Sequence, residues 1–175
     1  MGITGGGIIG GIQLKREEGL LLVMDTPKGR GIFAGKDIPA RTVLEVCPVL
    51  VLDPVENEKH IRKTNLYNYT YNWPYKCGNE KANGSIYTSE VPSTTQAVVL
   101  GLGSMFNHSS LHQNVGWERD LTNLLITYTT LRDIRTGEEL CISYGSRLTF
   151  KDTEAEAIQE RDDGEELLKS IELLD

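Results

Sequence analysis

Short β-favouring runs separated by turn residues constrain the fold of this chain more than any other feature. Apolar and β-branched residues gather in brief stretches, and Gly, Pro, Asn and Asp stand between them. Helical periodicity is scarce before residue 150, apart from a short helix that we predict at 54–64 with Asp53 as its N-cap. The sequence therefore predicts a mainly β fold, with strands at residues 20–24, 32–34, 43–46, 49–52, 85–88, 124–128 and 139–144.

A weak internal repeat relates two of these regions. Lys36-Asp37-Ile38 recurs as Arg132-Asp133-Ile134, and the apolar residues that follow each tripeptide recur at the same offset. Each copy has the pattern of a strand, a turn and a strand. Chance similarity between two hairpins is the alternative.

Composition divides the chain into three parts. Residues 1–19 are rich in glycine and predict a flexible leader, while residues 20–150 are enough to bury a core without disulfide bonds. Residues 151–175 contain ten of the 25 acidic residues but only three of the 18 basic ones. We expect this acidic tail to be partly helical or disordered.

Cysteine spacing and hydropathy bear on the compartment. Cys47, Cys77 and Cys141 lie far apart with no CxxC pair, so neither a disulfide framework nor a cysteine-based zinc site is predicted. No basic stretch precedes an apolar one near the start, and no apolar run reaches the roughly 18 residues that a membrane helix needs. We therefore expect no signal peptide, no transmembrane segment and a reducing compartment.

A polar segment at residues 104–115 directly follows an apolar run and contains the dipeptide Asn107-His108. His108 and His112 are four residues apart, but the segment has no helical pattern and no carboxylate as a third ligand, so no metal site is predicted. Ser109 follows His108 directly, and adjacent side chains rarely face each other. This argues against a serine nucleophile.

Two further stretches carry candidate binding groups. Gly29 and Gly31 flank Arg30, which indicates a backbone that approaches another group closely or adopts positive φ, with an ordinary hairpin turn as the alternative. Over residues 67–75 aromatic residues alternate with small or polar ones, which predicts a strand with one aromatic face. Such a face suits either a half-buried core or a slot for a cation.

Taken together, these motifs resemble those of the SET-domain protein lysine methyltransferases, over residues 20–150. The resemblance, which is nearest to small fungal proteins with little besides the domain, rests on the following residues: Gly29-Arg30-Gly31, Phe106-Asn107-His108-Ser109, Asn114-Val115, Leu131-Arg132-Asp133-Ile134, Gly137-Glu138-Glu139-Leu140 and Tyr144-Gly145. It implies several small β-sheets, short helices and a C-terminal pseudoknot that joins Asn107-His108 to Tyr144.

The resemblance also implies a cofactor, S-adenosyl-L-methionine, and a role for each matching residue. Tyr144 would be the catalytic tyrosine. The cofactor would be bound by Lys28, Arg30, Gly31, Asn107, His108, Tyr144 and Phe150. The channel for the target lysine would be lined by Tyr69, Tyr71, Tyr128 and Ile142.

The chain departs from many histone methyltransferases of this family at its C-terminal end. Those enzymes close the site with a cysteine-rich zinc segment, whose fourth ligand follows the Asn-His-Ser motif. Here Ser110 stands in that position and residues 146–175 contain no cysteine. We expect Phe150 to be the lid over the adenine, with a core plug that anchors the tail as the alternative.

The function that follows is protein lysine methylation, with a basic protein such as a histone tail, above all histone H3, as substrate. Methylation of a non-histone protein and a catalytically silent peptide- or cofactor-binding module are the alternatives. The net charge of −7 argues against direct nucleic-acid binding. We expect a nuclear, or cytoplasmic and nuclear, protein without membrane contact, and the sequence does not decide whether it forms a homodimer.

Overall fold

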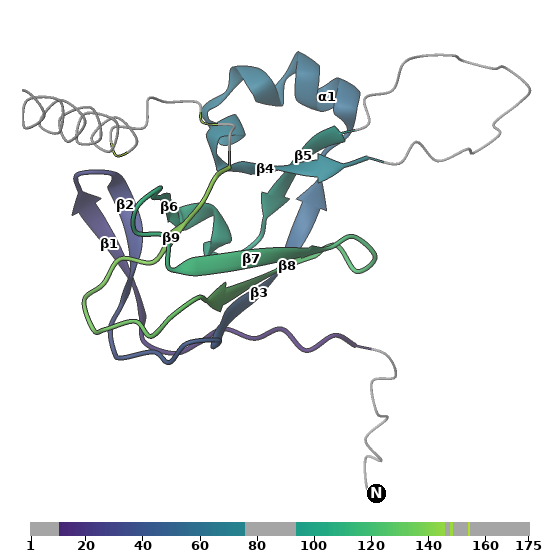
Figure 1. The fold of residues 1–175 in the computed structure, drawn as a ribbon. Helices are drawn as coiled ribbons and strands as arrows, with labels where there is room; N and C mark the ends of the chain where they lie inside the picture. Colours follow the sequence, from purple (N-terminus) through teal and green to yellow (C-terminus); the bar gives the residue numbers. More distant parts are fainter. Residues whose placement is uncertain (1–10, 76–93, 146–147, 149–153, 155–175) are drawn as a thin grey trace, which may run out of the picture.

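The computed structural model describes residues 11–75 and 94–145 together with Leu148 and Glu154. This part is mainly β, as predicted, and its strands form three sheets (Figure 1). The predicted strand at 85–88, the predicted lid Phe150 and the other residues of the acidic tail lie outside the described residues.

A five-stranded antiparallel sheet forms the centre of the molecule, in the order β4-β5-β3-β8-β7. Its strands are β3 (Val43–Val51), β4 (Thr70–Pro74), β5 (Thr94–Val99), β7 (Val115–Asp120) and β8 (Leu125–Thr130). Leu44, Ile126 and Tyr128 lie within the core that this sheet helps to bury.

The prediction of separate strands at 43–46 and 49–52 is wrong, because the two are one continuous strand, β3, that runs through Pro48. Pro48 pairs with Leu125 of β8, and pairing with β5 starts at the next residue, where Val49 meets Val99. Proline has no N–H to give to a ladder. Pro48 lies just outside the residues of β3 that pair with β5, so its missing N–H costs no ladder hydrogen bond to β5 and the strand continues through it.

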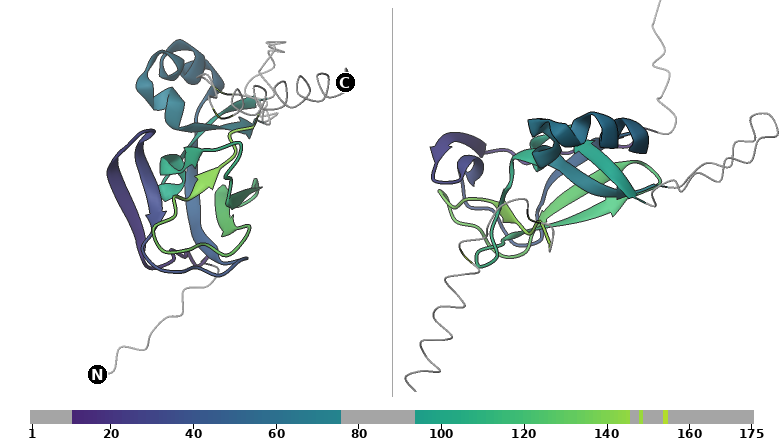
Figure 2. Two further views of the ribbon diagram at one scale, coloured as in Figure 1. Left: turned by 60° about the vertical axis from the view of Figure 1, so that its left-hand side comes forward. Right: turned by 90° about the horizontal axis from the view of Figure 1, so that it is seen from above.

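A two-stranded hairpin, β1 (Leu20–Thr26) and β2 (Gly29–Ala34), stands beside the central sheet. The third sheet pairs β6 (Asn107–His108) with β9 (Cys141–Ile142) and lies between the hairpin and the central sheet (Figures 1 and 2). β2 is joined to the segment before β9, since Ala34 N donates to Glu138 O and Leu140 N to Ile32 O. The hairpin is thereby fixed against the strand that leads to Tyr144.

The predicted N-cap at Asp53 is confirmed. Its carboxylate accepts from Val55 N and Glu56 N, both at 2.9 Å, at the start of α1 (Pro54–Lys59). The chain continues as short 3-10 turns, η1 (Ile61–Lys63) and η2 (Asn65–Tyr69), and passes into β4. A further 3-10 turn, η3 (Leu102–Met105), directly precedes Phe106 and β6.

The two copies of the internal repeat pair with each other. Ile38 and Ile134 exchange backbone hydrogen bonds of 2.9 and 2.8 Å. Asp37 accepts from Thr136 N and Asp133 accepts from Ala40 N, both at 2.7 Å. The repeated tripeptide is therefore a local two-fold arrangement, in which each copy caps the turn of the other.

Residues 15–17 are attached to the central sheet. Val46 N donates to Lys15 O at 2.9 Å and Glu17 N donates to Leu44 O at 2.7 Å. Between them the Arg16 guanidinium contacts the buried carboxylate of Glu45 at 2.6 Å. The division of the chain at residues 19 and 150 stays a prediction.

Candidate active site

Asn107 and His108 are placed by pairing in parallel with the strand that leads to Tyr144. Asn107 lies opposite Cys141 and His108 opposite Ile142, and Ser109 N extends the ladder by donating to Ile142 O at 3.1 Å. The polar segment and the C-terminal motif, which lie far apart in the sequence, meet along this short ladder.

Asn114 holds β9 from the other end of the same loop. Its side-chain oxygen accepts from Cys141 N and its amide nitrogen donates to Glu139 O, both at 2.8 Å. The residue is 1 % exposed, so these bonds form away from water, where the loss of a partner is costly. β9 is held both by β6 and by Asn114. This arrangement agrees with the C-terminal pseudoknot that the resemblance implied.

One hydrogen bond connects His108 to Tyr144. Tyr144 N donates to His108 Nδ1 at 3.1 Å, and the two rings lie 5.3 Å apart. Because Nδ1 accepts this bond, the neutral imidazole carries its proton on Nε2, which lies 3.2 Å from Ser110 Oγ. The orientation of the His108 ring is thus fixed by Tyr144 on one side and by the following loop on the other.

The phenol of Tyr144 is oriented by the backbone. Its hydroxyl donates to Phe106 O at 2.8 Å, and the residue stays 36 % exposed. Burial of the hydroxyl, with further contributions from Cys141, Tyr69 and Glu139, raises the pKa of Tyr144 to about 12. At neutral pH the group is an uncharged hydrogen-bonding phenol.

Gly31, Asn107 and Glu139 form a compact polar cluster beside the ladder. Asn107 Nδ2 donates to Arg30 O at 3.1 Å and to Glu139 Oε1 at 2.7 Å. A Cβ on Gly31 would lie 2.5 Å from Glu139 Oε1 and 2.8 Å from Asn107 Nδ2. The close approach predicted for this glycine pair is present at Gly31, and the positive φ is present at Gly29, where it is 86°.

Lys28 turns its side chain toward the end of β6. Its ammonium donates to His108 O at 3.0 Å and to Glu154 Oε1 at 2.8 Å. Desolvation lowers the pKa of Lys28, but the hydrogen bond and charge of Glu154 outweigh it and raise the pKa above its usual value. The end of the hairpin, β6 and Glu154 therefore meet at one point.

A cavity of about 480 Å³ lies next to Tyr144. Its wall includes Tyr69, Tyr71 and Tyr144, three of the residues that the resemblance assigned to the reaction site. Tyr71 is fixed by a bond from its hydroxyl to Gly103 O at 2.8 Å and by edge-on contact with Trp117 at 5.3 Å. Burial raises the pKa of the Tyr71 hydroxyl, so the wall is neutral there.

Tyr128 and Ile142 are not part of that wall. Both are fully buried in the core. Tyr128 lies directly behind Gly103, since a Cβ on Gly103 would lie 2.1 Å from the Tyr128 hydroxyl. Their assignment to the lysine channel stays a prediction. From the core they would affect the channel only indirectly, through the residues that line it.

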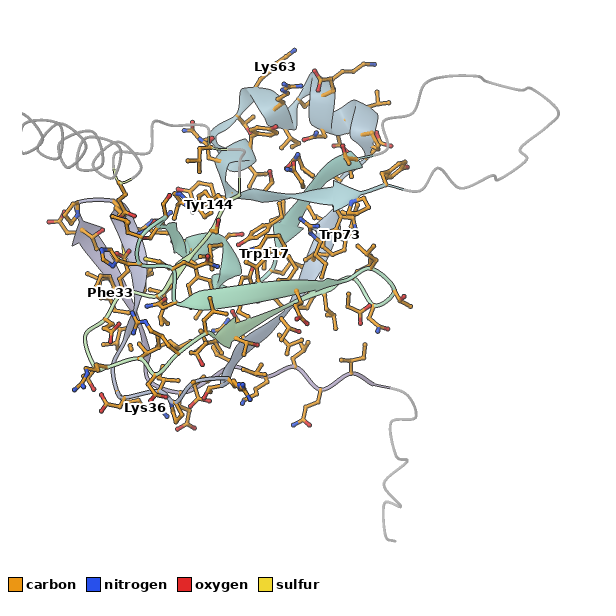
Figure 3. The ribbon with its side chains drawn as sticks, in the orientation of Figure 1. Phe33, Lys36, Lys63, Trp73, Trp117 and Tyr144 are labelled. Atoms are coloured by element: carbon orange, nitrogen blue, oxygen red, sulfur yellow. The ribbon has the colours of Figure 1, made fainter. Side chains whose placement is uncertain are left out.

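Several further residues of the cavity wall were not predicted from the sequence. Trp117 and Arg119 of β7 line the cavity together with Asn72, Gln96, Ser104 and Ser143. The Arg119 guanidinium lies 4.7 Å from the centre of the Trp117 ring, and Trp117 Nε1 donates to Ser143 O at 3.3 Å. Figure 3 shows Trp117 and Tyr144 in the space between β4 and β7. The alternation of Val115, Trp117 and Arg119 along one strand face was the available signal.

Over the described ranges, no group of three His, Cys, Asp or Glu residues could hold a metal ion. Among the same residues no helix is long and apolar enough to cross a membrane.

Comparison with known proteins identifies the family. Residues 29–145 match the family model of the SET domain. The chain belongs to the SET-domain family. A curated relative, the histone-lysine N-methyltransferase of Schizosaccharomyces pombe that is specific for lysine 37 of H3, is 45 % identical over 138 residues. That match covers 78 % of this SET-domain protein and 81 % of the relative.

Solved structures agree with the fold. A candidate histone methyltransferase of Plasmodium falciparum superposes with a TM-score of 0.50 at 22 % identity, covering 75 % of this chain and 96 % of the other. A SET8 protein of Cryptosporidium superposes with a TM-score of 0.50 at 19 % identity, covering 75 % of this chain and 59 % of the other. At such identities the likeness concerns the fold alone.

Proposed function

We propose that this SET-domain protein is an S-adenosyl-L-methionine-dependent lysine N-methyltransferase that acts on histone H3 in the nucleus. The observation that carries the proposal is the bond from Tyr144 N to His108 Nδ1, which joins the expected cofactor motif to the expected catalytic tyrosine beside an aromatic cavity. Family membership supports protein lysine methylation, and the S. pombe relative supports histone H3 as the substrate.

The polar cluster around Asn107 fits the charged end of the cofactor. Asn107 uses its amide nitrogen for Arg30 O and Glu139, so its side-chain oxygen is the acceptor that it offers to an ammonium group. Glu139, whose Oε1 accepts from Asn107 Nδ2, would add negative potential that favours a cationic cofactor. Lys28, Arg30, Gly31 and His108 would complete the cofactor site, which supplies a methyl group on a sulfonium.

The cavity suits a lysine side chain that must lose its proton. A lysine amine with a pKa near 10.4 is almost wholly protonated at neutral pH and has no lone pair with which to attack. Tyr69, Tyr71 and Trp117 offer faces that contact an alkyl chain, and a site with little water disfavours the ammonium form. Arg119 adds a like charge beside the same wall, which also lowers the pKa of a lysine bound there.

Tyr144 would orient the amine rather than remove its proton. Its hydroxyl hydrogen is used by Phe106 O, so toward the amine the phenol would act as a hydrogen-bond acceptor and not as a donor. With its pKa raised to about 12, the phenol is a poor base at neutral pH. Positioning of the amine is therefore the main contribution of this residue.

The test is methyl transfer from isotope-labelled cofactor to core histones, to H3 peptides that cover lysine 37, and to a cell lysate, read by mass spectrometry. We expect a methylated H3 lysine. A peptide with arginine in place of that lysine is the matched control, because it keeps the charge but lacks the amine.

Each other outcome selects an alternative. Labelling of lysate proteins without labelling of H3 would indicate a non-histone methyltransferase. Cofactor binding without any methylated product would indicate a silent module and would overturn the enzymatic proposal.

A further inference from the structure

Glu154 makes a dense set of contacts that the proposed mechanism does not use. Its Oε1 accepts from Lys28 Nζ at 2.8 Å, and its Oε2 accepts from Ser109 Oγ at 2.6 Å. The same Oε2 accepts from Ser110 N at 3.0 Å and from Leu111 N at 3.3 Å. A carboxylate with this many donors is bound as an anion and not merely placed at a surface.

These donors belong to two separate pieces of the cofactor motif. Lys28 comes from the turn between β1 and β2, whereas residues 109–111 follow β6 directly. Lys28 also donates to His108 O at 3.0 Å, and Ser109 Oγ accepts from His112 N at 2.8 Å. The carboxylate therefore ties the hairpin end to the loop on which the His108 ring depends.

The connection continues from the loop to the reaction site. Ser110, whose backbone bonds to Glu154, lies with its hydroxyl 3.2 Å from His108 Nε2. The other nitrogen of the same ring accepts from Tyr144 N at 3.1 Å. Displacement of the loop would thus move the imidazole and its support for Tyr144.

Position 110 is also where zinc-closed members of the family place a metal ligand. In this chain the residue is a serine, and its N–H is held by a carboxylate that comes from beyond the domain's last strand. Ion pairing and backbone hydrogen bonds can join two segments as a shared metal ion does, without needing a thiolate.

We propose that Glu154 is a positioning residue, an anionic latch that fixes the loop 109–111 and Lys28 and so holds His108 in place for the cofactor. The cofactor part of this proposal rests on the proposed function; the latch itself does not. Side chains at the two ends of the contact are partly covered, with 37 % of Lys28 and 22 % of Glu154 exposed, so the pair is not an ordinary surface ion pair.

Hydrogen exchange tests the latch without cofactor or substrate. In the full chain, Glu154→Ala should raise the exchange rates of the Ser110 and Leu111 amides at least about tenfold, because both lose a charged acceptor. Glu154→Gln should give a smaller increase. Glu58→Gln is the matched control, since Glu58 pairs with Arg62 at the same 2.8 Å but is 65 % exposed, and it should change neither amide.

Kinetics then test the positioning role. For Glu154→Gln we expect KM for the cofactor to rise at least about tenfold while KM for the peptide changes less than about twofold. Glu154→Asp should recover part of the cofactor affinity, which a loss of overall stability would not produce. Circular dichroism and Tm establish that each variant is folded.

Unchanged exchange of Ser110 and Leu111 in Glu154→Ala would overturn the latch. Faster exchange with unchanged cofactor affinity would overturn the positioning role. If the wild-type chain binds no cofactor, the proposed function fails, and the exchange result still decides whether Glu154 fastens the loop.

Discussion

At the scale of single residues, the site depends on side chains whose donor hydrogens already bond to other groups of the protein. The Tyr144 hydroxyl donates to Phe106 O, and the Asn107 amide nitrogen donates to Glu139. Such internal bonds fix a rotamer and reduce the entropy lost when a ligand binds. The side chains of both residues are then held in defined orientations.

Tyr144→Phe should lower kcat at least about tenfold, which corresponds to about 1.4 kcal/mol of barrier. The change removes only the hydroxyl that we propose orients the amine, and it keeps the aromatic ring beside His108. Steady-state kinetics on the H3 peptide measures the effect. Tyr75→Phe, outside the cavity wall, is the matched control, and wild-type turnover in Tyr144→Phe would remove this residue from its role.

Asn107→Asp should destabilise the protein more than Asn107→Ala. The aspartate would bring a second carboxylate to Glu139, whose Oε1 lies 2.7 Å from the amide nitrogen, and two like charges at that distance repel strongly. Asn107→Ala should instead weaken cofactor binding by about 1–3 kcal/mol, through loss of the hydrogen bond that we propose its side-chain oxygen makes with the cofactor.

Thermal unfolding at neutral pH measures the difference between the two Asn107 variants. Adding Glu139→Gln to Asn107→Asp should recover much of the lost Tm. If the double variant is no more stable than Asn107→Asp, charge repulsion is not the cause.

At the scale of elements, the buried acid Glu45 connects residues 15–17 to the cavity wall. Glu45 of β3 is 4 % exposed, contacts Arg16 and accepts from Leu102 N at 2.7 Å. Leu102 begins η3, which carries Gly103 and Ser104 of the cavity wall. Glu45 thus supports η3, which forms part of the cavity wall.

Glu45→Ala should lower the free energy of unfolding by about 1–3 kcal/mol, chiefly because Leu102 N loses its acceptor, whereas the Arg16 side chain is 56 % exposed and stays solvated. Guanidinium denaturation measures this free energy, provided that the dependence of the unfolding free energy on denaturant concentration is the same in both proteins. Glu118→Ala, on the exposed side of β7, should stay within about 0.5 kcal/mol and is the control. Equal effects of the two substitutions would contradict the supporting role.

The elements also show the limit of prediction from sequence. The strands β1, β2, β3 and β8, the Asp53 cap and the internal repeat followed from local patterns, since propensity and turn chemistry act over a few residues, whereas β5 and β7 were not predicted. The continuity of β3 through Pro48 did not, because it depends on where the partner strand β5 ends. A break at proline is a local rule, and pairing is a property of two strands.

At the scale of the whole molecule, the ion pair of Lys28 and Glu154 joins residues 126 positions apart. Burial alone would raise the pKa of the Glu154 carboxyl, but its hydrogen bonds from Lys28, Ser109 and Leu111 outweigh burial and lower the pKa to about 2. A folded-state pKa below the ordinary value of 4.5 stabilises the folded protein when the pH lies above 4.5. That contribution is lost as the pH falls toward 2.

The stability difference between the wild type and Glu154→Gln should therefore stay constant from about pH 8 to pH 5 and shrink below about pH 4.5. Comparing the two proteins cancels the titrations that they share. Chemical denaturation across this range measures the difference. A difference that disappears near pH 6 would be inconsistent with a carboxylate held as an anion.

The sequence by itself determined the mainly β class and the family motifs, because these follow from local propensity and from residue identity, whereas the close approach at Gly31 was one of several alternatives until the structure placed Glu139 and Asn107 beside it. Tyr69, Tyr71 and Tyr144, which the resemblance singled out, line one cavity, and their roles stay a prediction. Only the tertiary structure decided which layer each residue occupies. Tyr128 and Ile142 lie behind the wall, Trp117 and Arg119 lie in it, and Glu154 reaches Lys28. Periodicity indicates which face of a strand a side chain is on, but its distance from a ligand depends on how sheets and loops pack together.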